Sequence, residues 1–486
     1  MQFVCFGNTL VALRSYITNW RNRRFVIFPV CPGVDINTIL KGDVMKKLTK
    51  TFLVLAVLTA VTALSAKEIF VSLSTGKNKN PGTKAAPYKN LWKALSVAKD
   101  NDVIRIAEGI YPGRMKCGWF KLEKAVSLFG GYSADFSKRD PLKFKTMFQP
   151  RNEHNDKKAG AQGILHIELA KSPMNAPRGF HMIIDGIIFD DGFASSYHAT
   201  KGKPAGFDTG MWLEGPAMNK AADKFPSANR YSIHTAAASR GDGDLTIRNC
   251  TFVNGSNYAV NVNWYKGKVA ILNNVFCNNR MLSVNVNCSN GSGKINWECA
   301  YNTILFTWSR LNDLADMGFA IRNNSNCNAN IHHNIIGLNV LTGFDNTKGN
   351  PKQKKTRLDN NIFFLNRESD VQMTVSPSIA KVRVDGFEDL EGTDGIESIE
   401  GNADLKDPAI FKGRINAKYL NAFLSMKYSE KTKLDPGKCN ALRSVLGLPL
   451  QGTIKTKCDM YANRYPWAEA LNLFGALKGC GAQMPE

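Results

Sequence analysis

The sequence predicts an all-β solenoid, a single-stranded right-handed parallel β-helix, because two columns of short segments recur along the chain at matching intervals. Six segments of the first column align: 184–189 (IDGIIF), 247–252 (IRNCTF), 271–276 (ILNNVF), 299–304 (CAYNTI), 331–336 (IHHNII) and 358–363 (LDNNIF). A second column aligns 259–264 (AVNVNW) with 283–288 (SVNVNC), at the same offset that separates the second and third segments above. Repeats of this length are typical of stacked coils that have no core until they pack together. The handedness follows the rule for parallel crossover connections.

The first column carries an asparagine in most coils, and we expect this column to be structural. The fourth residues of the last four segments are Asn274, Asn302, Asn334 and Asn361, and Cys250 precedes them in register. Asn tolerates the left-handed backbone of a tight corner better than other residues except Gly. Amides stacked in register also hydrogen-bond one another, which satisfies polar groups in the core. The sequence therefore predicts a buried amide ladder, with the Cys250 thiol in the same column.

The second column predicts which side chains face outward. Its segments alternate with period two, so the valines share one face and the asparagines share the other. The inward valines are Val260, Val262, Val284 and Val286, and the outward asparagines are Asn261, Asn263, Asn285 and Asn287. Residues 319–322 (FAIR) continue the pattern less regularly and add Arg322 to the outward face.

Residues 45–66 have the pattern of a secretory signal peptide. Residues 45–50 are basic, 51–63 are apolar, and small residues at 63–66 offer cleavage sites. The apolar run is short for a membrane span, so we expect no transmembrane span in the mature chain. We expect residues 1–44 to be an upstream extension assigned by mistake, with Met45 as the true start. The protein would then be secreted, periplasmic or on the outer cell surface, with a mature chain that begins near Lys67.

The first elements of the mature chain resemble those of a known family. A strand at 69–72, a loop at 76–87, helical spacing at 91–99 and a strand at 102–107 follow in order. With residues 80–83 (NPGT), 86–88 (APY) and 109–111 (GIY), this stretch resembles the N-terminal cap of pectate-lyase-like right-handed parallel β-helix proteins. Residues 129–132 (FGGY), 139–141 (RDP) and 479–483 (GCGAQ) resemble secreted bacterial members of the "choice-of-anchor Q" type. In that family the capping helix plugs the open end of the solenoid, as terminal repeats require.

The mature chain divides into three parts by this pattern. We expect residues 67–130 to form the N-terminal cap and first coils, and 131–367 to form the coils, with long loops in 190–244. Residues 368–486 would form the last coil or coils and an irregular C-terminal cap. Long loops in solenoids usually lie on the binding face.

The net charge narrows the classes of partner molecule that the protein could bind. The formal net charge is +22, and removal of residues 1–66 leaves 55 basic and 39 acidic residues, a net charge of +16. A basic exported protein suggests an acidic polysaccharide or cell-surface glycan as partner, although a merely soluble basic surface explains the same charge. No nucleic-acid-binding module is visible, and we expect a monomer.

Nine cysteines follow residue 66; export permits disulfides, but their pairing cannot be read from the sequence.

The outward face of the second column is the candidate substrate-binding strip. We assign to it Trp212, Asn261, Asn263, Asn285, Asn287 and Arg322. Tryptophan stacks on sugar rings, amides bond to hydroxyls, and Arg322 is the only basic group in register, which makes it the one catalytic candidate. A polar face that merely keeps the sheet soluble explains the same residues.

Other polar residues give weaker signals. Asp242 and Asp244 lie in a Gly-rich segment and are candidate calcium ligands, but capping of the loop is the simpler explanation. We expect no other cofactor and no structural metal site. The seven histidines form no recognisable constellation in the sequence.

Two functions remain open. The first is an exported or surface-associated protein that binds an acidic polysaccharide without catalysis. The second is a polysaccharide lyase that cleaves an acidic polysaccharide by β-elimination, which requires a base and a group that neutralises the carboxylate. The resemblance and the net charge favour the lyase, whereas the absence of the Arg-x-Pro-x-x-Arg stretch of pectate lyases favours binding alone. Because a fold does not fix a function, we favour binding without catalysis.

Overall fold

The computed structural model describes residues 3–6, 9–12, 66–114, 118–151, 163–191, 210–212, 231–255, 257–291, 293–308, 317–427, 434–450, 456–457 and 461–485. The chain divides into two compact units, Met1–Ser65 and Ala66–Glu486. In the first unit, β1 (Phe3–Phe6) pairs antiparallel with β2 (Thr9–Ala12). The expected start at Met45 and the expected signal peptide lie outside the described residues, apart from Ala66.

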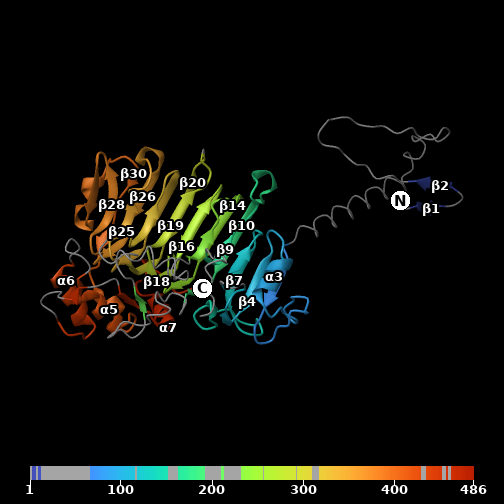
Figure 1. The fold of residues 1–486 in the computed structure, drawn as a ribbon, viewed down its shortest axis with the longest axis horizontal. Helices are drawn as coiled ribbons and strands as arrows, with labels where there is room; N and C mark the ends of the chain where they lie inside the picture. The colour runs from blue at the N-terminus through green and yellow to red at the C-terminus, as the bar shows by residue number, and fades with distance from the viewer. Residues whose placement is uncertain are drawn as a thin grey trace. The chain divides into compact units, whose positions relative to one another are not determined.

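The second unit winds three long sheets around one axis, and nearly all of their strand pairs are parallel (Figure 1). The first sheet contains β3 (Glu68–Val71), β4 (Val103–Ala107), β7 (Ser127–Tyr132), β10 (Arg178–Asp185), β14 (Asp242–Arg248), β17 (Lys268–Leu272), β20 (Ile295–Ala300), β23 (Cys327–His332), β26 (Lys355–Asp359) and β30 (Ile396–Ser398). The second contains β5 (Gly109–Tyr111), β8 (Thr146–Phe148), β11 (Ile187–Asp190), β15 (Thr251–Val253), β18 (Val275–Arg280), β21 (Thr303–Trp308), β24 (Ile335–Gly337), β27 (Ile362–Phe364) and β31 (Ala403–Asp404). The third contains β6 (Phe120–Leu122), β9 (Gly163–Ile167), β13 (Tyr231–Thr235), β16 (Val260–Trp264), β19 (Leu282–Cys288), β22 (Phe319–Asn323), β25 (Thr342–Asn346), β28 (Ser369–Val375) and β29 (Ser378–Val382), the last antiparallel to β28.

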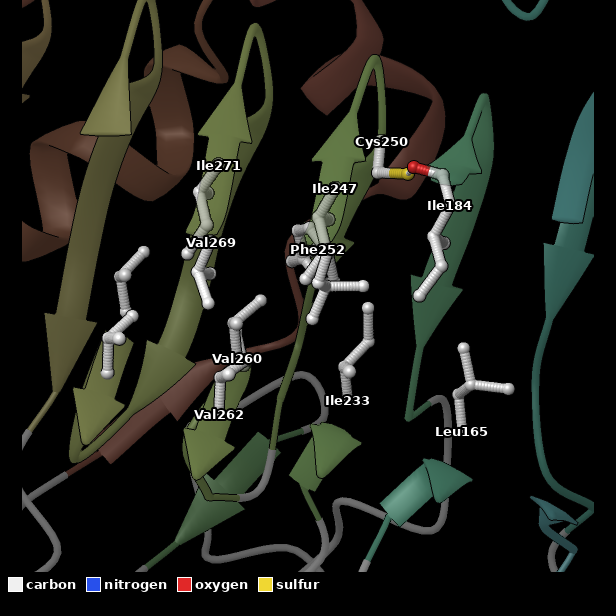
Figure 2. Packing of buried hydrophobic residues seen from close by; sticks show 14 of the residues in the cluster. Leu165, Ile184, Ile233, Ile247, Cys250, Phe252, Val260, Val262, Val269 and Ile271 are labelled. Atoms are coloured by element: carbon white, nitrogen blue, oxygen red, sulfur yellow. Dashed lines mark hydrogen bonds between the residues drawn. The ribbon is translucent and has the colours of Figure 1, made fainter. Parts of the chain in front are cut away.

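The core lies between the three sheets, where inward apolar side chains of successive coils stack. Val260 pairs with Val284 and Val262 with Val286, and all four are fully buried. Figure 2 shows Val260 and Val262 of the third sheet facing the same interior as side chains of the first sheet. Period-two alternation therefore places the valines inside, and the predicted parallel β-helix is confirmed.

The asparagine ladder runs along the corner between the first and second sheets. The Nδ2 atoms of Asn274, Asn302 and Asn334 each donate to the Oδ1 atom of the ladder residue in the next coil, over 2.9, 3.0 and 2.9 Å. Asn361 continues the ladder to Asn402 over 3.0 Å. The backbone N–H of Cys250, whose thiol is buried in the same column, donates to Asn274 Oδ1. The predicted buried ladder is confirmed, and it is one coil longer than expected.

The left-handed corner residue, in contrast, is not the ladder residue. Positive φ angles fall one position earlier, at Asn249, Asn273, Tyr301, His333 and Asn360. The expectation that the ladder asparagines adopt the left-handed backbone is therefore wrong. The two positions have different roles at the corner. The residue with positive φ directs its side chain outward, and the ladder residue that follows it directs its amide into the stack.

A second ladder at the next corner was not predicted. Asn279 Oδ1 accepts from the backbone of Gly255, Asn339 Oδ1 accepts from that of Thr307, and Asn339 Nδ2 donates to Asn366 Oδ1 over 2.8 Å. These polar side chains are fully buried. Internal hydrogen bonds between coils thus hold both of these corners.

Caps close the solenoid. The helix α3 (Leu91–Val97) buries Leu91 and Ala94 against the first coil, as the resemblance implies, and contacts β3 and β6. At the other end the 3-10 segment η6 (Val384–Leu390) inserts Phe387 and Leu390 into the core. The remaining short elements are η2 (Pro173–Asn175), η5 (Pro351–Gln353), η7 (Pro408–Phe411), α5 (Ala417–Leu424), α6 (Pro436–Val445), α7 (Trp467–Ala470), η8 (Leu471–Leu473), β32 (Met426–Lys427) and β33 (Thr456–Lys457).

The C-terminal region packs along the outer face of the second sheet rather than only at the end of the solenoid (Figure 1). Its last residues cross three consecutive coils at one corner: Gly481 N–H donates to His333 O, Ala482 N–H to Thr303 Oγ1 and Gln483 N–H to Asn273 Oδ1, over 2.8, 2.9 and 2.5 Å. We call residues 480–483 the C-terminal strap.

Among the described residues, no helix is long and apolar enough to cross a membrane.

Candidate functional site

The outward face of the third sheet carries two polar rows that run along the solenoid axis. The buried polar row comprises His166, His234, Asn261, Asn285, Arg322, Asp345 and Gln372, which are neighbours in the strand register. The half-exposed polar row lies two residues further along the strands and comprises Asn263, Asn287, Asn324, Thr347 and Thr374. Asn263 and Asn287 therefore lie where the sequence predicts. The expectation that Asn261 and Asn285 face solvent is wrong, because they are only 6% and 9% exposed.

A directional chain of side-chain hydrogen bonds satisfies these buried amides. Asn324 Nδ2 donates to Asn285 Oδ1 over 2.9 Å, and Asn285 Nδ2 donates to Asn261 Oδ1 over 2.7 Å. Asn261 Nδ2 then lies 3.0 Å from His234 Nδ1. Because an amide nitrogen only donates, Nδ1 of His234 accepts this bond and the ring proton sits on Nε2. The amides are thus engaged with one another and with an imidazole, and the chain fixes the tautomer of that imidazole.

Two histidines that are distant in the sequence meet at the end of this chain. The His166 and His234 rings stack at 5.4 Å between centroids, Tyr231 stacks on His234 at 4.5 Å, and the Trp119 ring lies tilted against His166 at 5.1 Å. Burial, reinforced by His166, lowers the pKa of His234 to about 4. Burial also lowers the pKa of His166, against the raising effect of Glu168. Both rings are therefore neutral at neutral pH, and the expectation that the histidines form no constellation is wrong.

The charges beside the histidines are balanced. Lys121, the register neighbour of His166, lies 2.8 Å from both Glu123 and Glu168. Lys171 lies 3.4 Å from Glu168, and hydrogen bonding by Lys121 lowers the pKa of Glu168. This end of the strip therefore presents paired charges and no isolated cation among these groups.

Arg322 is not the solvent-facing cation that the sequence predicts. Its side chain is 7% exposed and forms an ion pair with Asp345, which is fully buried, and its guanidinium lies 4.7 Å from the Phe319 ring centroid. Burial alone would raise the pKa of Asp345, but Arg322 and hydrogen bonds from Thr347 and Gln372 hold that pKa below its ordinary value. The pair is neutral overall and buried. Arg322 is therefore poorly placed to act as a base or to attract an acidic ligand.

The half-exposed polar row ends beside an aromatic ring and a cation that sequence reasoning missed. Tyr265 directly follows β16 and is half-buried, and the guanidinium of Arg240 lies 5.0 Å from its ring centroid. The neighbouring Trp264, in contrast, is 2% exposed and donates to Gly243 O. The signal for Tyr265 was available, because it continues the alternation of Asn261 and Asn263.

Trp212 does not continue the strand column. It belongs to β12 (Gly210–Trp212), which pairs antiparallel with β34 (Tyr461–Asn463) and with no strand of the third sheet. The placement of Trp212 in register with Asn261 is therefore wrong. Most of the expected long loops, including residues 192–209 and 213–230, lie outside the described residues.

The candidate calcium ligands have protein partners in the structure. Asp242 forms an ion pair with Lys266 over 2.7 Å, and Asp244 Oδ1 accepts from the backbone N–H of Lys268 over 2.8 Å. In the described part of the chain, no group of three or more His, Cys, Asp or Glu is placed to hold a metal ion.

Comparison with known proteins gives a short sequence match and distant structural likenesses. Residues 74–134 match the family model described as "Protein of unknown function (DUF1565)", and no curated protein matches. Pectate lyase Pel9A is 12% identical with a TM-score of 0.29, over 67% of this chain and 81% of that one. A rhamnogalacturonan lyase is 13% identical with a TM-score of 0.26, over 66% and 88% of the two chains. The GH136 lacto-N-biosidase from Eubacterium ramulus is 11% identical with a TM-score of 0.23, over 76% and 72%. The "choice-of-anchor Q" resemblance stays a prediction.

Proposed function

We propose that this protein binds a polysaccharide chain along the half-exposed polar row, with acidic glycans as the partner class. The observation that carries the proposal is the row itself, in which every side chain is an uncharged amide or hydroxyl and each belongs to a different coil. Strands of neighbouring coils lie about 4.8 Å apart. A polymer of repeating sugar units that lies along the axis would therefore meet a similar group at each step.

The amides of this row are oriented by the protein before any ligand arrives. Asn263 Nδ2 donates to Thr235 O over 2.9 Å, and Asn287 Nδ2 donates to Asn263 Oδ1 over 3.2 Å. Asn324 Nδ2 also donates to Val286 O over 2.7 Å. A primary amide has two N–H groups and two acceptor lone pairs, so each retains capacity for a sugar hydroxyl. Orientation in advance reduces the entropic cost of binding.

The acidic class is supported by charge. The net charge of the chain after residue 66 is +16, from 55 basic and 39 acidic residues, and Arg240 places a cation at one end of the row, over the ring of Tyr265. An aromatic ring with an adjacent guanidinium suits a sugar that carries a carboxylate, because the ring stacks on the sugar face and the cation pairs with the anion.

A matched pair of substitutions tests the binding site. Asn287→Ala removes an amide from the row, and Asn328→Ala removes one from the first sheet, where Asn328 Nδ2 donates to Asn296 Oδ1 over 3.0 Å. We expect Asn287→Ala to weaken binding to pectate, alginate or a glycosaminoglycan about 3- to 10-fold, the equivalent of one hydrogen bond. Asn328→Ala should bind as the wild type does. Equal affinities of the two variants, or no binding to any of these polymers, would contradict the proposal.

The ring and the cation are tested in the same assay. Tyr265→Ala should weaken binding at every salt concentration, whereas Arg240→Gln should weaken it mainly at low salt, because exposed charges are screened. A neutral glucan serves as the comparison ligand. If the glucan bound as tightly as the acidic polymers, the binding proposal would stand and the acidic class would not.

We propose further that the protein is exported and acts outside the cytoplasm, as the signal-like pattern of residues 45–66 suggests. N-terminal sequencing of the protein recovered from the periplasm or the medium should begin near Lys67. Retention of residues 2–44 in the recovered protein would refute this.

A lyase is the second candidate, and one observation favours it. His166 is a neutral imidazole 3.9 Å from Glu168, and neutral imidazole is a proton acceptor. Incubation with pectate, alginate and glycosaminoglycans, with and without calcium, should then release unsaturated uronates that His166→Gln abolishes. Binding without unsaturated products would exclude the lyase for these polymers and leave the binding proposal intact.

A further inference from the structure

The cysteines of the solenoid differ in their surroundings, and two of them share one site. Of the seven cysteines described, Cys250, Cys277 and Cys299 are fully buried core thiols in separate positions, and Cys439 and Cys480 lie in the C-terminal region. Cys288 and Cys327 meet at the corner between the third and first sheets. Cys288 packs against the core cluster that contains Cys327, and its thiol helps to raise the pKa of the Cys327 thiol.

Topology brings these two residues together from different coils. Cys288 is the last residue of β19, and Cys327 is the first residue of β23. β20, which follows the loop after Cys288, begins at Ile295, and Ile295 pairs directly with Cys327. Cys327 therefore lies next to the corner between β19 and β20, one coil further along the axis.

Both side chains point into the same corner of the core. Cys288 alternates with Val284 and Val286, so it faces inward, and it packs against the core cluster that contains Cys327. The Cys327 thiol donates to Val286 O over 3.8 Å, and the backbone N–H of Cys288 is near enough to lower the pKa of this thiol in part. Because the Cys327 sulfur lies this close to the end of β19, rotation about χ1 of Cys288 brings the two sulfurs toward each other.

Little holds the Cys288 thiol in its present rotamer. It donates to Asn290 O and Gly293 O over 3.4 and 3.6 Å, both within the corner loop that follows β19. Thiols are weak donors, so these bonds cost little to break. Cys288 is also partly exposed, whereas Cys327 is fully buried.

We propose that Cys288 and Cys327 form a disulfide that joins successive coils when the folded chain meets a small-molecule or protein disulfide. The thiolate of Cys288, the accessible member, attacks the external disulfide and releases one external thiol. The sulfur of Cys327 then loses its proton and displaces the second external thiol from Cys288. The two cysteines are oxidised, the external disulfide is reduced to two thiols, and no other co-reactant is required.

The order of attack follows from burial. Burial raises the pKa of Cys327 to about 12, so this thiol is a poor first nucleophile. Once Cys288 carries the external group, the second step is intramolecular and benefits from proximity. The cross-link would fasten the third sheet to the first at a corner where a buried amide pair, Asn323 Nδ2 to Asn346 Oδ1 over 3.3 Å, already joins two successive coils.

The experiment uses the purified full chain in buffers of reduced and oxidised glutathione. After alkylation of free thiols and digestion without reductant, mass spectrometry should show a peptide in which Cys288 is joined to Cys327. Cys250, Cys277 and Cys299 should be alkylated only after denaturation. Alkylation of both Cys288 and Cys327 after oxidation, or linkage of either to another cysteine such as Cys117 or Cys458, would overturn the proposal.

A stability measurement provides the second readout. The oxidised wild type should melt at a higher temperature than the reduced protein, because a cross-link restricts the unfolded chain. Cys288→Ala and Cys327→Ala should melt at one temperature in both buffers, and Cys299→Ala should retain the difference. If Cys288→Ala kept the wild-type difference between the two buffers, the effect would belong to other cysteines and the assignment would fail.

Discussion

Replacement of Asn334 by Leu should remove the central rung of the first asparagine ladder. Asn334 Oδ1 accepts from the backbone N–H and the side-chain amide of Asn302, over 2.9 and 3.0 Å. Asn334 Nδ2 donates to Cys299 O and Asn361 Oδ1, over 2.8 and 2.9 Å. Leucine has a similar volume but no polar atom, so every one of these bonds is lost.

The magnitude depends on which groups lose their partners. The Asn302 backbone N–H and the Cys299 carbonyl belong to fully buried residues, and each buried group left unpaired costs about 1–3 kcal/mol. The Asn302 amide keeps its bonds to Ile271 O and Ala300 O, so it adds little. The leucine side chain offsets part of the loss by burying apolar surface. We expect the variant to be destabilised by about 2–4 kcal/mol.

Guanidinium unfolding measures this difference, and Asn328→Leu in β23, the strand that precedes Asn334, is the matched control. Asn328 lies on the outer face of the first sheet, where surface substitutions change stability by roughly 0.5 kcal/mol or less. The midpoint should fall for Asn334→Leu and hardly change for Asn328→Leu, with equal slopes. Equal midpoints for the two variants would show that the ladder does not stabilise the fold as we argue.

Three further outcomes follow from buried charges and imidazoles. Because burial lowers the pKa of His234 from its ordinary value of 6.5 to about 4, the unfolded chain binds more protons between these values. About 3 kcal/mol of stability should therefore be present above pH 6.5 and lost as the pH falls to 4; His234→Gln should flatten that slope in pH-dependent unfolding. Burial likewise lowers the pKa of Lys354 to about 8, so stability should rise from pH 8 to the ordinary pKa of 10.5, and Lys354→Met should abolish this rise. Arg322→Ala should cost about 3–5 kcal/mol by leaving Asp345 buried and unpaired, and the double variant with Asp345→Asn should recover part of the loss in the same unfolding assay.

Sequence patterning predicted the fold because each coil repeats the same local rule. Period-two alternation in residues 259–264 and 283–288 placed the valines inside, and the spacing of the first column predicted the ladder. The second ladder was missed because Thr307 interrupts it, although Asn339 and Asn366 show the same separation as Asn334 and Asn361.

The candidate site was less predictable than the fold. Period-two alternation along a strand predicts which face of the sheet a side chain is on, but it does not predict whether neighbouring side chains bury it. The sequence placed Arg322 outward, but its partner Asp345 lies outside both aligned columns. His166 and His234 become neighbours only through strand register across a long insertion, which no local pattern reveals. The predicted placement of Trp212 was wrong for the same reason, since β12 pairs with β34 and does not extend the second column.

The C-terminal strap has a consequence for how this protein can evolve. A solenoid of near-identical coils can in principle grow or shrink by duplicating or deleting one coil. Here three successive backbone N–H groups of the strap bind three successive coils, at His333, Thr303 and Asn273. An extra coil inserted between β17 and β23 would shift one contact by about 4.8 Å, beyond the reach of any hydrogen bond. The strap therefore fixes the number of coils between β17 and β23. A change in that number would require a compensating change in the last residues of the chain.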